Sequence, residues 1–92
     1  YEPEWAIGAD EPAPPEYIAE RATFMRNWLI NRYGEEAIHP IPMIYGGAVF
    51  PDNAAWLLST PDIDGLGARR KSRNAKEFAS IAKIVGKAFD LI

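Results

Sequence analysis

PMIYGG (residues 42–47) and PDIDGLG (residues 61–67) are the two stretches that decide the fold of this chain. Each contains a short apolar run that ends at glycine, and neither run is long enough to form a helix. Each stretch is followed by a loop and then by a segment with helical periodicity. Short apolar runs that alternate with helices are typical of βαβ units, in which crossover helices join parallel strands. We therefore predict an α/β fold with two neighbouring parallel strands.

The longest helix is predicted between Pro15 and Tyr33. Apolar side chains recur there at helical spacing, whereas most charged side chains lie off that stripe. Pro15 suits the first helical turn, where its missing N–H costs nothing. Gly34 is a typical residue just after a last turn. The stripe that we expect to be buried consists of Ile18, Ala22, Met25 and Leu29.

Two further helices are predicted in the second half of the chain. One begins near Asn74, a suitable N-cap, and Glu77 follows three residues later as in a capping box. A shorter helix is predicted over about residues 52–59. The buried stripe after Asn74 is expected to be Phe78, Ile81, Ala82, Val85 and Phe89. With a strand stub at Tyr1, the order is strand, long loop and helix, followed twice by strand, loop and helix.

The composition is that of a small globular unit. The chain has 92 residues, of which 48% are hydrophobic and 25% are charged, so we do not expect disorder. No apolar run is long enough for a membrane helix, and we expect no membrane partner. Cysteine is absent, which excludes disulfides and thiol catalysis and is compatible with the cytoplasmic location that we expect. The net charge of −3 argues against a nucleic-acid partner.

A basic run at residues 69–76 stands out against this acidic background. It holds five Lys and Arg residues and no acid. It is either a solvated loop before a helix or a site for an anion. A nucleic-acid patch is disfavoured, because no aromatic side chain lies between the charges to stack on a base.

The opening stretch YEPEWAIG (residues 1–8) resembles the loop after strand six of the triosephosphate isomerase family. The stretch IYGG (residues 44–47) is similar to its strand-seven motif, and PDIDG (residues 61–65) to the approach to strand eight. The resemblance implies a partial (β/α)8 barrel, with parallel strands and outer helices. Residues 1–92 would be the last three βα units, an incomplete C-terminal segment of one barrel domain of about 250 residues.

The resemblance also implies the roles of individual residues. Glu2 would be the catalytic base, which moves a proton between adjacent carbons of the substrate. Neither a cofactor nor a metal is implied, and the partner would be a small phosphorylated sugar. The residues that would bind its phosphate group are Gly8, Gly47, Ala48, Arg69 and Arg70. The lid over the site would run from about Pro3 to Ala13 and would use Pro3, Trp5, Ile7 and Tyr45.

The implied activity is the aldose–ketose isomerisation of a triose phosphate, in glycolysis and gluconeogenesis, by a homodimeric full-length protein. Three features depart from the family pattern. Arg69 and Arg70 replace a pair of glycines, Ala48 replaces a serine, and the lid continues with Ala9-Asp10-Glu11-Pro12. The acidic, proline-rich lid sequence EPAPPEY (residues 11–17) resembles a branch of the family that acts on erythrulose phosphates, which is the first alternative. The second alternative is a non-catalytic barrel fragment that self-associates, and we expect these 92 residues alone to be inactive.

Overall fold

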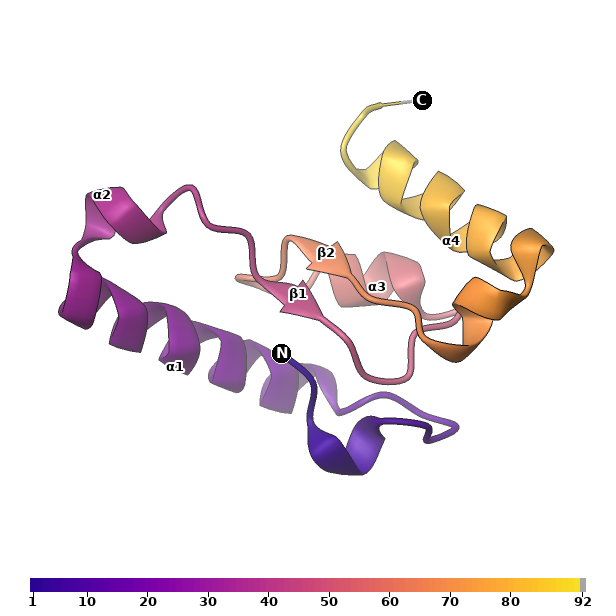
Figure 1. The fold of residues 1–92 in the computed structure, drawn as a ribbon, viewed down its shortest axis with the longest axis horizontal. Coiled ribbons are helices and arrows are strands. Elements are labelled where there is room, and N and C mark those ends of the chain that lie inside the picture. The colour runs from indigo at the N-terminus through magenta and orange to yellow at the C-terminus, as the bar shows by residue number, and fades with distance from the viewer. Residues whose placement is uncertain (92) are drawn as a thin grey trace.

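The computed structural model describes residues 1–91, and a small parallel sheet lies at its centre (Figure 1). Strand β1 comprises Ile44–Tyr45 and strand β2 comprises Gly65–Leu66. The two strands are parallel, with Ile44 opposite Gly65 and Tyr45 opposite Leu66. The predicted pair of parallel strands is therefore confirmed.

Tyr1 lies on the other side of β1 and extends the ladder. Its nitrogen donates to the carbonyl of Ile44, and the Gly46 N–H donates to the Tyr1 carbonyl over 2.8 Å. Two such bonds on either side of Tyr45 are the hydrogen-bond pattern of parallel strands. Tyr1, β1 and β2 thus lie side by side in chain order, although Tyr1 does not form a regular strand. Glu2 follows Tyr1, and Gly46 follows β1. Both residues therefore lie at the same edge of the sheet.

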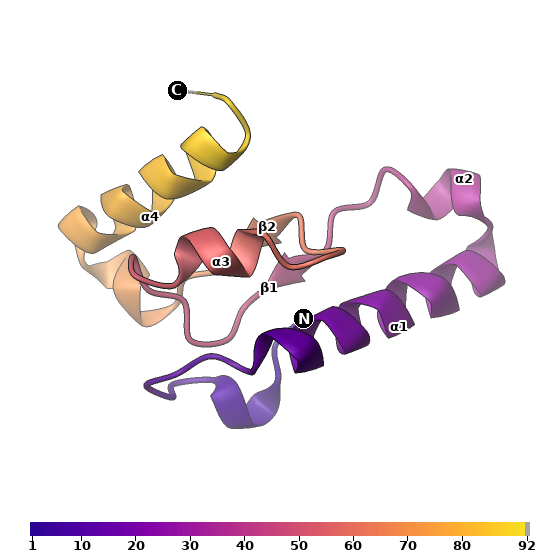
Figure 2. The same ribbon diagram turned by 180° about the vertical axis from the view of Figure 1, so that it is seen from behind.

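Three longer helices accompany these strands. Helix α1 comprises Pro15–Tyr33, α3 comprises Ala54–Leu58 and α4 comprises Ala75–Ala88. Figure 2 shows α3 in front of the two strands, with α1 and α4 on either side of it. The helices therefore follow one another in the order of the strands, as in an outer helical layer. No helix within residues 1–91 has the length and apolar character needed to cross a membrane.

The predicted helix bounds were right for α1 and too wide for α3. Helix α1 begins at Pro15 and ends at Tyr33, and Gly34 follows it with φ of 90°, a conformation that glycine adopts without strain. Three short helical segments were not predicted from the sequence. They are η1 (Glu4–Ala6), α2 (Glu35–Ile38) and η2 (Arg70–Arg73).

The core lies between the sheet and the helices. Ile18 and Ala22 of α1 are buried as predicted, whereas Met25 and Leu29 are only partly buried. Tyr45 of β1 and Leu57 of α3 are fully buried. The cluster of buried side chains consists of Ala13, Ile18, Ala22, Met43, Tyr45, Val49, Ala54, Leu57, Ile63 and Ile81.

The predicted buried stripe of α4 was largely wrong. Ile81 is buried and Val85 is partly buried, but Ala82 is exposed and the side chains of Phe78 and Phe89 are 46% and 48% exposed. Helix α4 packs against α3 and η2 and projects from the rest of the molecule (Figure 1). Ile81, Ile84 and Val85 contact the core, whereas Phe78 and Phe89 are largely exposed within residues 1–91.

The start of α4 forms half of the predicted capping box. The Asn74 side chain accepts a hydrogen bond from the Glu77 N–H over 3.0 Å, so Asn74 is the N-cap. The Glu77 carboxylate does not bond back to Asn74. It pairs with Lys71 of η2 over 3.0 Å instead.

Arg26 ties α1 to the segment that leads into β2. Its guanidinium lies 3.3 Å from a carboxylate oxygen of Asp62 and 3.0 Å from one of Asp64. The same Asp64 oxygen accepts the Met43 N–H over 2.8 Å, just before β1. Arg26 thereby links α1 to the segments that lead into β1 and β2.

Candidate active site

Glu2 lies where the predicted strand stub ends, against the backbone of the neighbouring strand loop. A Cβ atom added to Gly46 would lie 2.8 Å from the Glu2 Cγ, so the glutamate side chain rests directly on Gly46. The side chain is 48% exposed, and its Oε2 lies 3.4 Å from Nη2 of Arg69. A carboxylate at this edge of a parallel sheet can accept a proton from a ligand held in front of it.

The five residues predicted to bind phosphate all line one small cavity. Gly8 comes from the lid, Gly47 and Ala48 from the loop after β1, and Arg69 and Arg70 from the segment after β2. The cavity holds about 20 Å³, which is room for about one water molecule. Segments far apart in the sequence thus meet at one place, beside Glu2. Their predicted role as phosphate ligands remains a prediction.

Arg70 contacts the lid as well as the cavity. Its Nη2 donates to the Ala9 carbonyl over 2.8 Å. Its guanidinium also lies 5.9 Å from the centre of the Phe50 ring, within the range of a cation–π contact. The lid is therefore held at its middle by a side chain from the segment after β2.

The lid is a compact body with buried and exposed parts. Pro3 is buried, and η1 follows it. Trp5 is 57% exposed, but its ring packs edge-on against Tyr17 of α1 at 5.5 Å between ring centres. Ile7 is 36% exposed. At the far end, the Ala13 N–H donates to the buried hydroxyl of Tyr45 over 3.0 Å.

Three tyrosines beneath the lid have perturbed pKa values. Burial raises the pKa of Tyr45, and burial together with a hydrogen bond to Tyr17 raises the pKa of Tyr1 to about 12. The pKa of Tyr17 is lowered, chiefly by its hydrogen bond with Tyr1. The raised pKa values of Tyr1 and Tyr45 favour their neutral forms, whereas the lowered pKa of Tyr17 favours its phenolate.

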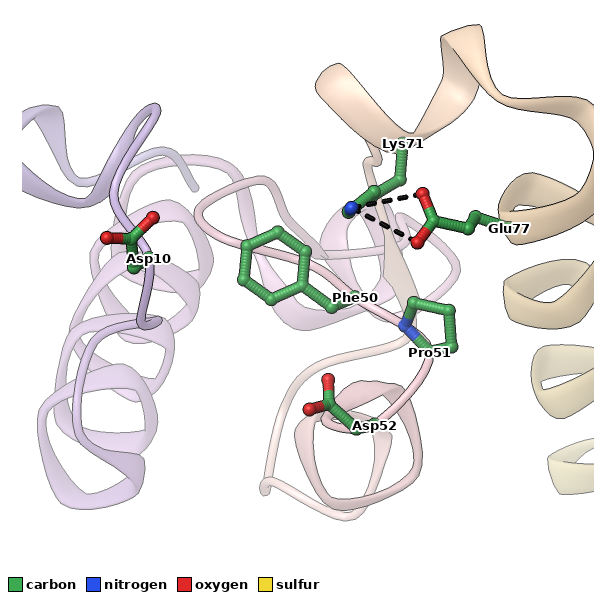
Figure 3. A pocket seen from close by; sticks show the side chains of 6 residues that line it. All are labelled: Asp10, Phe50, Pro51, Asp52, Lys71 and Glu77. Carbon is green, nitrogen blue, oxygen red and sulfur yellow. Dashed lines mark hydrogen bonds and ion pairs between the residues drawn. The ribbon is translucent and has the colours of Figure 1, made fainter.

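A larger cavity adjoins the small one, and Figure 3 shows the side chains that line it. It holds about 400 Å³ and is lined by Asp10, Phe50, Pro51, Asp52, Lys71 and Glu77. Figure 3 shows the Phe50 ring between Asp10 of the lid and the Lys71–Glu77 ion pair. Phe50 and Lys71 line both cavities. The Lys71 ammonium lies 5.5 Å from the Phe50 ring centre.

Phe50 and Lys71 were not predicted as site residues. The only sequence signal for Lys71 was its place directly after Arg69 and Arg70 in the basic run. No sequence feature pointed to Phe50 as a site residue, apart from its position after the Gly46–Gly47 pair. Within residues 1–91, no three His, Cys, Asp or Glu side chains lie close enough together to hold a metal ion.

The chain is similar to known proteins along most of its length. A family model described as triosephosphate isomerase matches residues 1–85. The triosephosphate isomerase of Xanthobacter flavus is 43% identical over 86 residues, which are 94% of this chain and 34% of that protein. The triosephosphate isomerase of Solibacter usitatus (strain Ellin6076) is 40% identical over 81 residues, 88% of this chain and 32% of that protein.

A solved structure gives the same picture for the fold. The crystal structure of triosephosphate isomerase from Bartonella henselae matches with a TM-score of 0.76 and 32% identity, over 91% of this chain and 32% of that chain. The predicted partial (β/α)8 barrel is thereby confirmed. The chain spans about a third of the length of the curated relatives that it matches.

Proposed function

The chain belongs to the triosephosphate isomerase family, and from that membership we propose that it supplies the catalytic base and the phosphate site of a sugar-phosphate isomerase. The whole protein, meaning a full-length chain that contains this segment, would interconvert glyceraldehyde 3-phosphate and dihydroxyacetone phosphate. Residues 1–92 would be the C-terminal segment of its single barrel domain. A homodimer and a cytoplasmic location are part of the same proposal, because the resemblance to the family implies both.

The observation that carries this proposal is the position of Glu2 next to the small cavity. The carboxylate rests on Gly46, and the cavity is lined by Gly8, Gly47 and Ala48 together with two arginines. A sugar held by its phosphate in that cavity would have its carbon chain in front of the carboxylate. Such fixed positioning is a large part of how enzymes accelerate a proton transfer.

The reaction needs only the movement of protons. The Glu2 carboxylate would take the proton from the carbon next to the substrate carbonyl, which leaves an enediol. It would then return the proton to the neighbouring carbon, so that an aldose becomes a ketose with no net oxidation or reduction. The acid groups that polarise the carbonyl would come from the part of the barrel that precedes this segment. Residues 1–92 alone would therefore be inactive.

The lid would exclude water from the enediol. Its body includes Trp5 against Tyr17, and its middle is held by Arg70 at Ala9. Its far end is bonded to Tyr45 at Ala13. Closure of a loop over a reactive intermediate suppresses side reactions with solvent. Pro3 would limit the movement of the first hinge, because its ring fixes φ.

The names of the relatives favour a triose over a tetrose substrate. The erythrulose-phosphate alternative and the self-associating fragment gain no support from these similarities. The arginine pair at the cavity is nevertheless a feature that the substrate must accommodate. We therefore propose the triose reaction and treat the tetrose reaction as a competing outcome of the assay.

The test is an isomerase assay of the whole protein with glyceraldehyde 3-phosphate and with erythrulose phosphate. Turnover of the triose is expected, and Glu2→Gln should lower kcat by about 10²- to 10⁴-fold, because the base is lost. Glu36→Gln, which alters an exposed glutamate of α2, is the matched control and should leave kcat unchanged. Inactivity on both sugars, or full activity of Glu2→Gln, would refute the proposal.

A further inference from the structure

Arg69 faces two parts of the candidate site at once. Its Nη2 lies 3.4 Å from the Glu2 carboxylate, and its side chain also lines the small cavity that contains Gly8, Gly47 and Ala48. It is therefore the side chain that touches both the proposed base and the proposed phosphate site. A ligand that enters the cavity and moves the Arg69 guanidinium would therefore also alter the contact of this guanidinium with Glu2.

The contact between Arg69 and Glu2 is a weak one. Charge-assisted N–H···O bonds usually measure about 2.7–2.9 Å, and this one is 3.4 Å long. The two side chains are 63% and 48% exposed. Ion pairs at such exposed positions contribute little to stability, because water and salt screen them. Little free energy is needed to separate Arg69 from Glu2.

A phosphate group would be a better partner for the same guanidinium. It carries a charge of about −1.5 to −2 near neutral pH, and arginine binds it through two parallel hydrogen bonds. A carboxylate carries only one charge, and here it accepts from a single Arg69 nitrogen. Phosphate therefore competes well with Glu2 for this side chain.

The size of the cavity requires a side chain to move when phosphate binds. At about 20 Å³ the cavity has room for about one water molecule, and a phosphate group is larger. Arg70 is held by the Ala9 carbonyl over 2.8 Å and by the Phe50 ring. The contact of Arg69 with Glu2 is longer and weaker than the contact of Arg70 with Ala9. Arg69 is therefore the side chain that moves.

We propose that Arg69 is a positioning residue for the base, an inference that rests on the function proposed above. Without substrate its guanidinium holds the Glu2 carboxylate, and when the substrate phosphate enters the cavity it turns to the phosphate and releases the carboxylate. Binding of a phosphorylated sugar thus increases the fraction of Glu2 that is free to act as the base. Arg69 would thereby make the reaction more selective for phosphorylated substrates.

The kinetic test compares glyceraldehyde 3-phosphate with glyceraldehyde, which lacks the phosphate, in the whole protein. Arg69→Gln should lower kcat/KM for the phosphorylated sugar by about 10- to 100-fold, because a charged hydrogen bond is lost. The same variant should raise kcat/KM for glyceraldehyde, by up to about fivefold, because the restraint on Glu2 is gone. A merely structural role would lower both values in parallel, and that result would overturn the proposal.

Two further variants sharpen the comparison. Arg70→Gln removes the neighbouring guanidinium, which does not contact Glu2, so activity on the phosphorylated sugar should fall without any rise for glyceraldehyde. Arg69→Lys keeps the charge and should keep the low activity on glyceraldehyde. A rise for glyceraldehyde in Arg70→Gln as large as in Arg69→Gln would contradict the proposal.

A binding experiment separates this inference from the proposed activity. The carboxyl resonance of isotope-labelled Glu2 is followed in the whole protein while inorganic phosphate is added at constant pH. It should shift and saturate in the wild type and in Arg73→Gln, but it should not move in Arg69→Gln. A protein that turned over no sugar would refute the proposed function, yet this titration would still test Arg69. Phosphate that fails to bind, or binds without moving the resonance, would overturn the inference.

Discussion

Gly46 and Glu2 are packed so closely that residue 46 has no room for a side chain. A Cβ atom there would lie 2.8 Å from the Glu2 Cγ and 2.9 Å from its Oε1. Real Cβ atoms essentially never make contacts this short, so something must shift if one is added. The atoms that would yield belong to the far end of a flexible side chain, namely the carboxylate proposed to be the base.

Gly46→Ala should therefore harm activity more than stability. The Glu2 carboxylate would be displaced by about 1 Å, and a misplacement of that size can cost about 10²-fold in kcat. The free energy of unfolding should change by less than about 1 kcal/mol, because no core side chain moves. Activity assays and urea unfolding of the whole protein measure the two effects.

Gly67→Ala is the matched control for that experiment. A Cβ at residue 67 would meet its nearest neighbour, the Gly46 Cα, at 3.7 Å, which is an ordinary contact. It should leave both kcat and the free energy of unfolding nearly unchanged. Equal losses of kcat in the two variants would argue against a specific contact between residue 46 and Glu2.

Tyr45→Phe should destabilise the end of the lid. The Tyr45 hydroxyl is the acceptor for the buried Ala13 N–H, and phenylalanine would leave that donor without a partner. An unsatisfied buried donor costs about 1–3 kcal/mol, so the free energy of unfolding should fall by that amount. Hydrogen exchange at the Ala13 amide should become faster in the same variant. Tyr33→Phe, at a side chain that is 58% exposed, should change neither quantity.

The same tyrosine predicts a loss of stability at high pH. Burial raises the pKa of Tyr45 above its unfolded value of 10.0, because the buried site disfavours the phenolate. The stabilising contribution is therefore complete below pH 10.0 and is lost as the pH rises from there through the folded pKa. As the pH rises above 10.0, the unfolding free energy of the wild type should therefore fall more steeply than that of Tyr45→Phe. Equal slopes in the two proteins would contradict a raised pKa.

The sequence predicted the sheet, the longest helix and the set of site residues for different physical reasons. Short apolar runs that end at glycine and alternate with helices identified the parallel pair. Helical periodicity between Pro15 and Gly34 identified α1. The family motifs predicted Glu2 as the base and five residues as phosphate ligands; the five line one cavity, and all of these roles stay predictions. Those residues gather because the carboxyl ends of parallel strands share one edge.

The parts that could not be predicted depend on contacts between distant segments. The Arg69–Glu2 and Arg70–Ala9 contacts join residues more than sixty positions apart, and no local pattern encodes them. The wrong prediction of the buried stripe of α4 has a different cause. Its helical period was predicted correctly, but burial requires a partner, and Phe78, Ala82 and Phe89 of its stripe are exposed within residues 1–91.

Arg26→Ala should weaken the attachment of α1 to the strands. The Arg26 side chain is 16% exposed and pairs with Asp62 and Asp64, of which the second also holds the Met43 N–H. Its removal should lower the free energy of unfolding of the whole protein by about 2 kcal/mol. Arg26→Lys should recover only part of that loss, because an ammonium cannot reproduce the planar fork that reaches both carboxylates. Arg73→Ala, at an exposed position of η2, should cost less than about 0.5 kcal/mol.

Arg70→Gln should loosen the middle of the lid while leaving the fold intact. The variant removes the 2.8 Å bond from the guanidinium to the Ala9 carbonyl and the contact with the Phe50 ring. A charged hydrogen bond of this kind contributes about 1.5 kcal/mol, so amide hydrogen exchange over residues 4–11 should become about tenfold faster. Arg70→Lys should give an intermediate rate, since it keeps the charge but not the planar group. Arg73→Gln removes a charge from the same short helix and should leave the exchange of the lid unchanged. If Arg70→Gln and Arg73→Gln gave the same exchange rates, Arg70 would not be the residue that holds the lid.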